Sequence, residues 1–465
     1  MRRLIAVLSL LTAPPLLAQS MPPTPPAGAA AKADALSIPF ERYTLPNGLE
    51  VILSQDRRAP VVAVNLWYHV GAFHEQPGRT GFAHLFEHMM FQGSEHVADD
   101  QHIGMLQKLG ASDLNGTTNF DRTNYFETVP SNLLETALWL ESDRMGFLLP
   151  AMTEEKLRTQ KDVVMNERRQ GTETQPYGLA NERFWQALFP APHPYHGVVI
   201  GSMADLEAAT QEDVSSFFNT WYRPSNATLA IVGDFEIDEA KKLVEKYFGS
   251  LKSGPKPVAP TVQPAKLAGP VTIDHDEPVA SLPMIMMGWH SPALYSQGDA
   301  TADVLAGILA TGRSSRLYKR LVFEKQLAQT VTAYQQSMGA QSVFTIEAVA
   351  RPGVSLQQLQ TEIDAVLAEV RAKGVTQAEV QRVRNRVQTQ ALNGLQAVGG
   401  FGGKSDLLQS YNHFLGEPDK LAWDLARYEA VTPQEVQAFA KKLDDTRVIL
   451  KATPKAAPAA AKEVK

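Results

Sequence analysis

"FAHLFEHMMF", residues 82–91, is the stretch on which the interpretation of this sequence depends. It places His84 and His88 four residues apart, with Glu87 directly before the second histidine. On a helix, residues i and i+4 lie on the same face one turn apart, so both imidazoles can face one ion. Glu87 lies close to that face but is displaced sideways, where its carboxylate can accept a proton from a metal-activated water. The pattern is therefore typical of metal-assisted hydrolysis of an amide.

An ordinary helix with surface histidines is the alternative interpretation of this stretch, with a buried apolar stripe formed by Phe82, Leu85, Phe86 and Met89. The two interpretations are compatible, because packing of the stripe would hold ligands on the other face rigidly. Imidazole suits zinc, and a catalytic zinc usually has three protein ligands and a water. The chain has no cysteine, so the ligands must be His, Asp or Glu. The inverted motif H-x-x-E-H takes its third ligand from a later helix, and Glu167 in "DVVMNERRQ" is the candidate.

Length and composition indicate an ordinary globular protein with more than one domain. The chain has 465 residues, of which 44% are hydrophobic and 20% are charged. One hydrophobic core rarely serves so long a chain, so two or more domains are expected. The net charge of −6 and the lack of basic runs give no reason to expect a nucleic acid as partner.

The N-terminus differs in character from the rest of the chain. Residues 1–18 combine two arginines, an apolar run and a small residue at the end, which is typical of a secretory signal peptide. A membrane anchor is the weaker alternative, because Pro14 and Pro15 interrupt a run that is short for a span. Residues 19–37 are rich in Pro and Ala and are predicted to be disordered. We therefore expect an exported protein, periplasmic or secreted, without a membrane span in the mature chain.

Strand and helix patterns alternate through both halves of the remaining chain. A hairpin is predicted around Asn47-Gly48, and strands are predicted at 61–70, 111–130 and 226–235. Ser131 and Thr153 are expected to cap two helices. A proline-rich linker at 253–270 separates a domain at 38–252 from one at 271–453, and a flexible tail covers 454–465. The glycine-rich stretch "AVGGFGG" (397–403) is interpreted as a loop between helices without a nucleotide-binding role. Together these patterns predict a duplicated α+β domain.

Several stretches resemble the insulinase/pitrilysin-type metallopeptidases, especially the short-chain branch that includes the mitochondrial processing peptidases. They are "LPNGLEVILSQD", "GRTGFAHLFEHMMFQGS", "NERR", "PSNATLAIVGDF" and "TGRSSRLYKRL". The resemblance implies one Zn²⁺ per chain held by His84, His88 and Glu167, with Glu87 as general base. It also implies two similar domains, each an antiparallel sheet flanked by helices, that enclose a chamber with a partner or second copy.

The resemblance also implies how a peptide substrate is held. In the family a strand near the metal binds the substrate by adding it as an extra strand. "ASDLNGTTNF" matches that strand, and Asn115 matches an asparagine that holds the substrate backbone; a plain turn residue before Gly116 is the alternative. Many active relatives carry an acidic residue seven positions before the third ligand, where this chain has Gln160. Because groups behind a ligand orient it, this difference puts the catalytic rate in doubt.

A second departure concerns the second domain. Single-type peptidases of the family carry an Arg and a Tyr seven residues apart that hydrogen-bond the substrate and the oxyanion of the transition state. The matching positions here are Val322 and Gln329, while Tyr318 and Arg320 lie out of register. The resemblance therefore suggests the zinc-bearing catalytic subunit of a heterodimer, whose homologous partner supplies the Arg/Tyr pair. We expect a zinc-dependent endopeptidase for small or unfolded peptides; the alternative is a non-catalytic, core-type assembly or peptide-binding subunit of the same fold.

Overall fold

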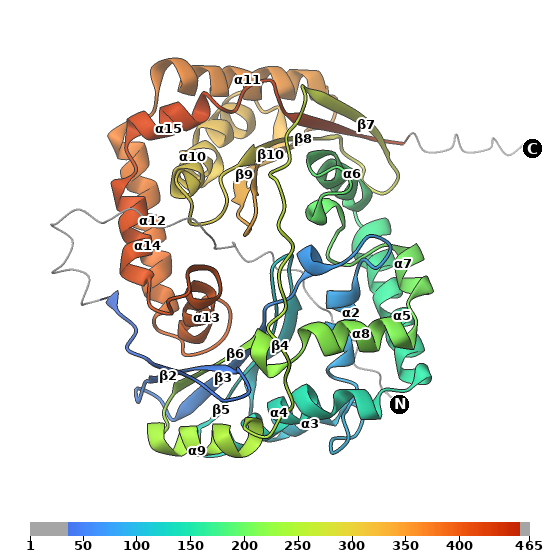
Figure 1. Cartoon of the computed structure of the whole chain (residues 1–465). Coiled ribbons are helices and arrows are strands. Elements are labelled where there is room, and N and C mark those ends of the chain that lie inside the picture. Colours follow the sequence, from blue (N-terminus) through green and yellow to red (C-terminus); the bar gives the residue numbers. More distant parts are fainter. Residues whose placement is uncertain (1–35, 456–465) are drawn as a thin grey trace, which may run out of the picture.

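The computed structural model describes residues 36–455 (Figure 1). The predicted signal peptide, residues 19–35 of the predicted disordered segment and residues 456–465 of the predicted tail lie outside this range. The prediction of disorder is wrong for Leu36 and Ser37, because both pack against the second half of the chain. The Ser37 hydroxyl donates a 2.6 Å hydrogen bond to Asp419, and Leu36 contacts an apolar cluster. Within residues 36–455, no helix is both long and apolar enough to cross a membrane.

The first half of the chain forms a six-stranded sheet in the order β1-β2-β6-β3-β5-β4. Its strands are β1 (Glu41–Thr44), β2 (Glu50–Gln55), β3 (Val61–Tyr68), β4 (Ser112–Thr118), β5 (Thr123–Pro130) and β6 (Ala227–Gly233). The Asn47-Gly48 hairpin and the other predicted strands are confirmed. All neighbours are antiparallel except β2 and β6, which are parallel. β4 is an edge strand of this sheet.

Helices cover one face of the first sheet, the side that carries Leu53, Val64, Tyr125 and Val129. They are α2 (Phe82–Met89), α3 (Gln101–Lys108), α4 (Leu134–Ala151), α5 (Glu154–Arg168), α7 (Met203–Ala208), α8 (Gln211–Trp221) and α9 (Ile237–Phe248). Thr153 caps α5 as predicted, accepting a hydrogen bond from the Lys156 N–H. The predicted cap at Ser131 is wrong. Its hydroxyl is 3.3 Å from Asp234 instead, and a short 3₁₀ turn separates it from α4.

The second half forms a five-stranded sheet in the order β7-β11-β8-β10-β9. Its strands are β7 (Val271–Glu277), β8 (Met284–Ser291), β9 (Ala328–Gln336), β10 (Ser342–Ala350) and β11 (Val448–Pro454). The helices of this half are α10 (Asp299–Ala310), α11 (Leu356–Lys373), α12 (Gln377–Gly394), α13 (Lys404–Leu415), α14 (Leu421–Ala430) and α15 (Pro433–Ala440). The α+β class with two similar domains is confirmed, and each sheet is antiparallel apart from one parallel pair, here β7 and β11.

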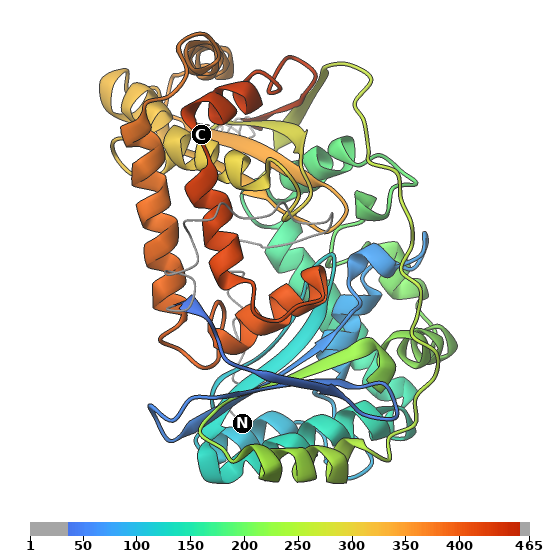
Figure 2. The same ribbon diagram turned by 60° about the vertical axis from the view of Figure 1, so that its left-hand side comes forward.

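The two halves exchange one helix each. α6 (Gly178–Leu188) belongs to the first half but packs on β7, β8 and β11 of the second sheet. α13 belongs to the second half but packs on β3 and β6 of the first sheet (Figure 2). The side-chain amide of Gln409, on α13, donates 2.7 Å hydrogen bonds to the carbonyls of Asn65 and Thr228. The inner face of each sheet is therefore covered by the other half of the chain.

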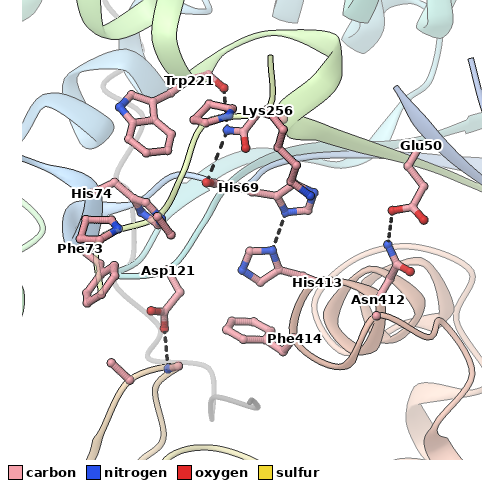
Figure 3. A pocket seen from close by; sticks show the side chains of 17 residues that line it. Glu50, His69, Phe73, His74, Asp121, Trp221, Lys256, Asn412, His413 and Phe414 are labelled. Carbon is pink, nitrogen blue, oxygen red and sulfur yellow. Dashed lines mark hydrogen bonds between the residues drawn. The ribbon is translucent and has the colours of Figure 1, made fainter. Parts of the chain in front are cut away.

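Residues 253–270, the predicted linker, run between the halves without helix or strand (Figure 1). A cavity of about 580 Å³ lies beside this segment, and Lys256 and Pro257 contribute to its wall. Two other residues of its lining contact each other: Nδ1 of His69 and Nδ1 of His413 are 2.5 Å apart (Figure 3). Because His69 follows β3 and His413 belongs to α13, this imidazole pair joins the two halves.

The histidine pair predicts that acid weakens the contact between the halves. Burial lowers the pKa of His69 to about 3 and the pKa of His413 well below its usual value, and Lys256 and His74 act in the same direction. Both imidazoles are therefore neutral in the folded protein, whereas each takes up a proton below about pH 6.5 in the unfolded chain. Stability is thus fully present above pH 6.5 and is lost as the pH falls toward 3. At pH 5 the loss should reach about 1–2 kcal/mol for His69, and His413 adds to it in the same direction.

Urea unfolding at pH 7.5 and pH 5 measures this effect. His413→Gln keeps a polar side chain but removes one titrating group, so its midpoint should fall less between the two pH values than that of the wild type. His196→Gln, in the 3₁₀ turn Pro194–His196, serves as the control and should keep the wild-type pH dependence, because this imidazole contacts the Phe189 carbonyl and not the histidine pair. Equal acid sensitivity of His413→Gln and the wild type would contradict the assignment.

Candidate metal centre

His84, His88 and Glu167 lie together between α2 and α5. Nε2 of His88 is 3.2 Å from Oε2 of Glu167, and Nε2 of His84 is 3.9 Å from the same oxygen. Ligand atoms of all three residues lie within 4.8 Å of one another, and among the described residues this is the one such group of His, Asp and Glu. α2 supplies the two imidazoles from adjacent turns, as the spacing predicts, and α5 packs against it.

The chemistry of this cluster fits a divalent metal ion. Nε2 of His88 faces the Glu167 carboxylate and is buried, but it makes no well-aligned hydrogen bond. Burial lowers the pKa of His84, which keeps its imidazole neutral and able to donate a lone pair to a metal. Burial acts to raise the pKa of Glu167, but the adjacent His88 and His84 outweigh it, and the net shift is downward. Two imidazoles and one carboxylate are a ligand set used by catalytic zinc sites.

Glu87 lies beside the cluster and next to β4. Glu87 is only 5% exposed, which is unusual for a residue with a carboxyl group. A Cβ added at Gly116 would lie 3.1 Å from Cγ of Glu87 and 3.0 Å from the ring of Phe91. The absence of a side chain at Gly116 therefore lets the edge strand approach the glutamate closely. The carboxylate of Glu87 can therefore reach a molecule bound between β4 and the cluster of His84, His88 and Glu167, although Glu87 is not part of that cluster.

Asn115 lies on β4, the edge strand, directly opposite Phe126 of β5. Its side chain is partly exposed, and its amide oxygen accepts a 3.0 Å hydrogen bond from the Gly116 N–H. The register of β4 shifts between Ser112 and Asn115, and Asp113 has a positive φ of 52°. This irregularity bends the start of the strand. The remainder of β4 presents a free edge to which an extended peptide could pair.

Three residues differ from the pattern of the resembling peptidases: Gln160, Val322 and Gln329. Gln160 is buried on α5, two turns before Glu167. Val322 is partly buried in the π-helical segment Tyr318–Glu324, and Gln329 is exposed on β9. Arg320 is held by Glu362 at 2.7 Å and by Glu369 at 3.1 Å, so its guanidinium is engaged on the surface of its own domain.

Two groups hold α2 in place and are not predicted by the sequence analysis: Glu75 and the pair of Arg144 and Tyr125. The carboxylate of Glu75 accepts hydrogen bonds from the Gly81 and Ala83 N–H groups at the start of the helix, at 2.9 and 2.8 Å. Burial raises the pKa of Glu75 to about 8, although these hydrogen bonds act against the shift. No pattern in the sequence indicates this contact, because the loop between Glu75 and the helix has to fold back to make it.

The second support comes from a buried charged group. Arg144 stacks on Tyr125 with its guanidinium carbon 4.1 Å from the ring centre, and it pairs with Glu141. The Tyr125 hydroxyl in turn donates a 3.2 Å hydrogen bond to the Phe86 carbonyl on α2. The sequence does carry a signal for this group, since "LESDR" places charged residues within an apolar helix.

Two family models match the chain. The model described as "Insulinase (Peptidase family M16)" matches residues 50–189, which include His84, Glu87, His88 and Glu167. The model described as "Peptidase M16 inactive domain" matches residues 208–387, which contain none of these four residues. Together the two matches span well over half of the chain, and both describe the same family.

Known relatives agree with these matches. The "Zinc protease PqqE" of Helicobacter pylori is 29% identical over 80% of this chain and 83% of its own length. The crystal structure of a protease from Helicobacter pylori has a TM-score of 0.82 and 27% identity, covering 90% of this chain and all of that one. The fold also matches the periplasmic protease PqqL of Escherichia coli, with a TM-score of 0.71, 19% identity and 48% of that chain covered. The chain belongs to the peptidase M16 (insulinase) family.

Proposed function

We propose that this chain is a zinc-dependent endopeptidase and acts as the catalytic subunit of a heterodimer. The observation that carries the proposal is the convergence of His84, His88 and Glu167 beside a buried Glu87 and a free strand edge. A structural subunit has no physical need for all of these groups in one place. The name of the Helicobacter relative, a zinc protease, supports the same activity.

In the proposed mechanism, His84, His88 and Glu167 hold one Zn²⁺. A bound zinc would polarise the scissile carbonyl and lower the pKa of a water to about 7. The carboxylate of Glu87 would accept the proton of the attacking water and deliver it to the nitrogen of the leaving amine. Glu75 and Tyr125 would keep α2 in place, so that the distance between Glu87 and the substrate carbonyl stays short.

A peptide would bind by pairing with the free edge of β4. The backbone N–H and C=O groups of that edge provide affinity that depends little on sequence. Asn115 would hold the peptide backbone near the glutamate. Since the strand accepts only an extended chain, unfolded or short peptides are the expected substrates.

A homologous partner would complete the site. Val322 cannot donate a hydrogen bond from its side chain, and Arg320 is engaged by Glu362 and Glu369. The chain therefore offers no free arginine at this position for the oxyanion. This chain covers 48% of the PqqL chain of Escherichia coli, which is therefore about twice as long. The N-terminal sequence and the same relative's description as periplasmic support export.

A non-catalytic assembly or peptide-binding subunit is the second candidate. The model that matches residues 208–387 is described as an inactive domain, which favours a role without hydrolysis for that half of the chain. Hydrolysis of peptides by the purified protein distinguishes the two candidates.

Replacing Glu167 by Gln should reduce metal content. The amide is neutral and a weaker ligand, so zinc should be lost at low free zinc while the fold is retained. Zinc stoichiometry after dialysis against a zinc buffer measures the effect. Glu154→Gln, on the exposed first turn of the same helix, should keep the wild-type stoichiometry. An unchanged zinc content in Glu167→Gln would remove this residue from the ligand set.

Replacing Glu87 by Gln should preserve zinc but abolish turnover. Removing a general base typically lowers the rate by about 10²–10⁴-fold. Turnover of a quenched fluorescent peptide, expressed per bound zinc, is the measurement. Glu95→Gln, an exposed change a few residues after the helix, should behave as the wild type. Substantial residual turnover in Glu87→Gln would refute the assigned role.

The partner hypothesis predicts a large difference between the chain alone and the chain co-expressed with a homologous subunit that lacks the metal motif. Loss of one oxyanion donor costs about 10²–10³ in rate, so the complex should exceed the isolated chain by at least that factor. Turnover per zinc in both preparations gives the answer. Equal turnover in both preparations would refute the requirement for a partner but would not contradict the endopeptidase activity.

A further inference from the structure

The glycine-rich loop between α12 and α13, residues 395–403, crosses the inner face of the first sheet. A Cβ added at Gly399 would lie 2.2 Å from Oγ1 of Thr128 and 2.9 Å from Cβ of Ala63. The loop thus lies flat over β5 and β3, at a distance that only glycine allows. At the next residue, a Cβ on Gly400 would lie 3.5 Å from Cγ of Asp113 on β4. The chain therefore runs from the middle of the sheet toward its free edge.

Polar contacts at both ends hold the loop in this position. The Arg58 guanidinium donates a 2.9 Å hydrogen bond to the Leu395 carbonyl. Lys404 forms a 2.8 Å ion pair with Asp56. Arg58 and Asp56 both follow β2 in the first half. The loop of the second half is thus anchored on the first sheet.

Phe401 is the residue that this loop carries to the edge. Its ring packs edge-on against the ring of Phe126 at a centroid distance of 5.1 Å, and 51% of the residue remains exposed. Phe126 is directly opposite Asn115 in the β4–β5 pair. Side chains of directly paired residues lie on the same face, so Phe401 lies on the Asn115 face of the edge strand.

Gly116 faces the opposite side of the sheet, where Glu87 lies. Consecutive residues of an added strand alternate between the two faces. One substrate side chain would therefore point toward Glu87 and α2, while its neighbour, opposite Asn115, would point toward Phe401 and Phe126. We propose that Phe401, supported from beneath by the buried Phe126, forms a subsite for a large apolar or aromatic side chain of the substrate, at the residue that pairs with Asn115. Phe401 is thus a specificity-determining residue contributed by the second domain.

The surroundings of the subsite define its chemistry. The exposed part of the Phe401 ring offers apolar contact area, and the buried Phe126 ring beneath it holds Phe401 in an edge-to-face arrangement to which a third ring could be added. The carboxylate of Asp113 is exposed beside the loop at Gly400, so an acidic substrate side chain is disfavoured. This inference rests on the proposed function in one respect: it assumes that a peptide pairs with β4.

Hydrolysis of a peptide series tests the subsite in the full chain with its partner. The series consists of ten-residue peptides of Ala, Ser and Gln that carry one Phe at each position in turn, with mass spectrometry of the products. The wild type should cleave at a fixed distance from the Phe. Phe401→Ala should lower the ratio of kcat/KM for the Phe peptides to kcat/KM for the all-Ala parent by about 10-fold, since burial of such a group is worth 10-fold or more. Phe401→Leu should restore part of the preference.

Val279→Ala is the matched control, because it truncates another exposed apolar residue, in the β7–β8 turn of the second domain. It should keep the wild-type preference. Circular dichroism and zinc content should be equal in all variants. If Phe401→Ala retains the wild-type preference for Phe, the subsite is refuted while the endopeptidase assignment stands.

Binding separates this inference from the proposed function. In the Glu87→Gln background, fluorescence anisotropy of labelled Phe and all-Ala peptides measures affinity without turnover. Tighter binding of a Phe peptide that is lost in Phe401→Ala supports the subsite even if the wild type hydrolyses nothing, in which case only the endopeptidase assignment fails. Equal binding of both peptides, or a preference that survives Phe401→Ala, overturns the subsite.

Discussion

Each sheet of this protein needs cover on two faces, and its own half of the chain supplies cover for only one. The exchange of α6 and α13 solves this problem, and the remaining architecture depends on it. On the inner face of the first sheet, Gln409 is fully buried and its amide satisfies two strand carbonyls. A buried amide without partners would cost free energy, so this contact also fixes where α13 lies along the strands.

The same exchange gives β4 and β5 two different surroundings. One face carries the packed helices with Glu87, His84 and His88, where the geometry must be rigid for catalysis. The other face meets residues from the second half, including the glycine-rich loop and its phenylalanine. Strand residues alternate between the two faces of a sheet. A peptide on the edge of β4 would therefore contact Glu87 and the metal-ligand cluster on one face, and the selective residue Phe401 on the other. The two properties can then change independently, since they belong to different segments of the sequence.

The sequence predicts those parts of the molecule that depend on local spacing. The hairpin at Asn47-Gly48, the helix with His84 and His88, and the Thr153 cap all follow from residues within a few positions of one another. Glu167 lies far from the histidines in sequence, and it was placed through resemblance to a family rather than through spacing. Ser131 looked like a helix cap, but Asp234, brought near by the fold, competes for its hydroxyl.

Other features could not be predicted, because they depend on contacts over long separations. The helix exchange joins Asn65 to Gln409 across 344 positions. Glu75 acts on α2 through a loop whose path no pattern indicates. Arg144 could have been noticed as a charge in an apolar helix, but its target, the ring of Tyr125, lies on a different element. The bulge at Asp113 arises where β4 meets the second half, and a strand pattern alone contains no sign of it.

The helix exchange also sets the order in which the chain can fold. Residues of β3 leave the ribosome some 340 positions before α13, whose Gln409 completes the cover of that strand. Until then the inner face of the first sheet has no partner, and contacts at such separation are slow to form. The first sheet therefore reaches its complete native surroundings only after α13 has been synthesised.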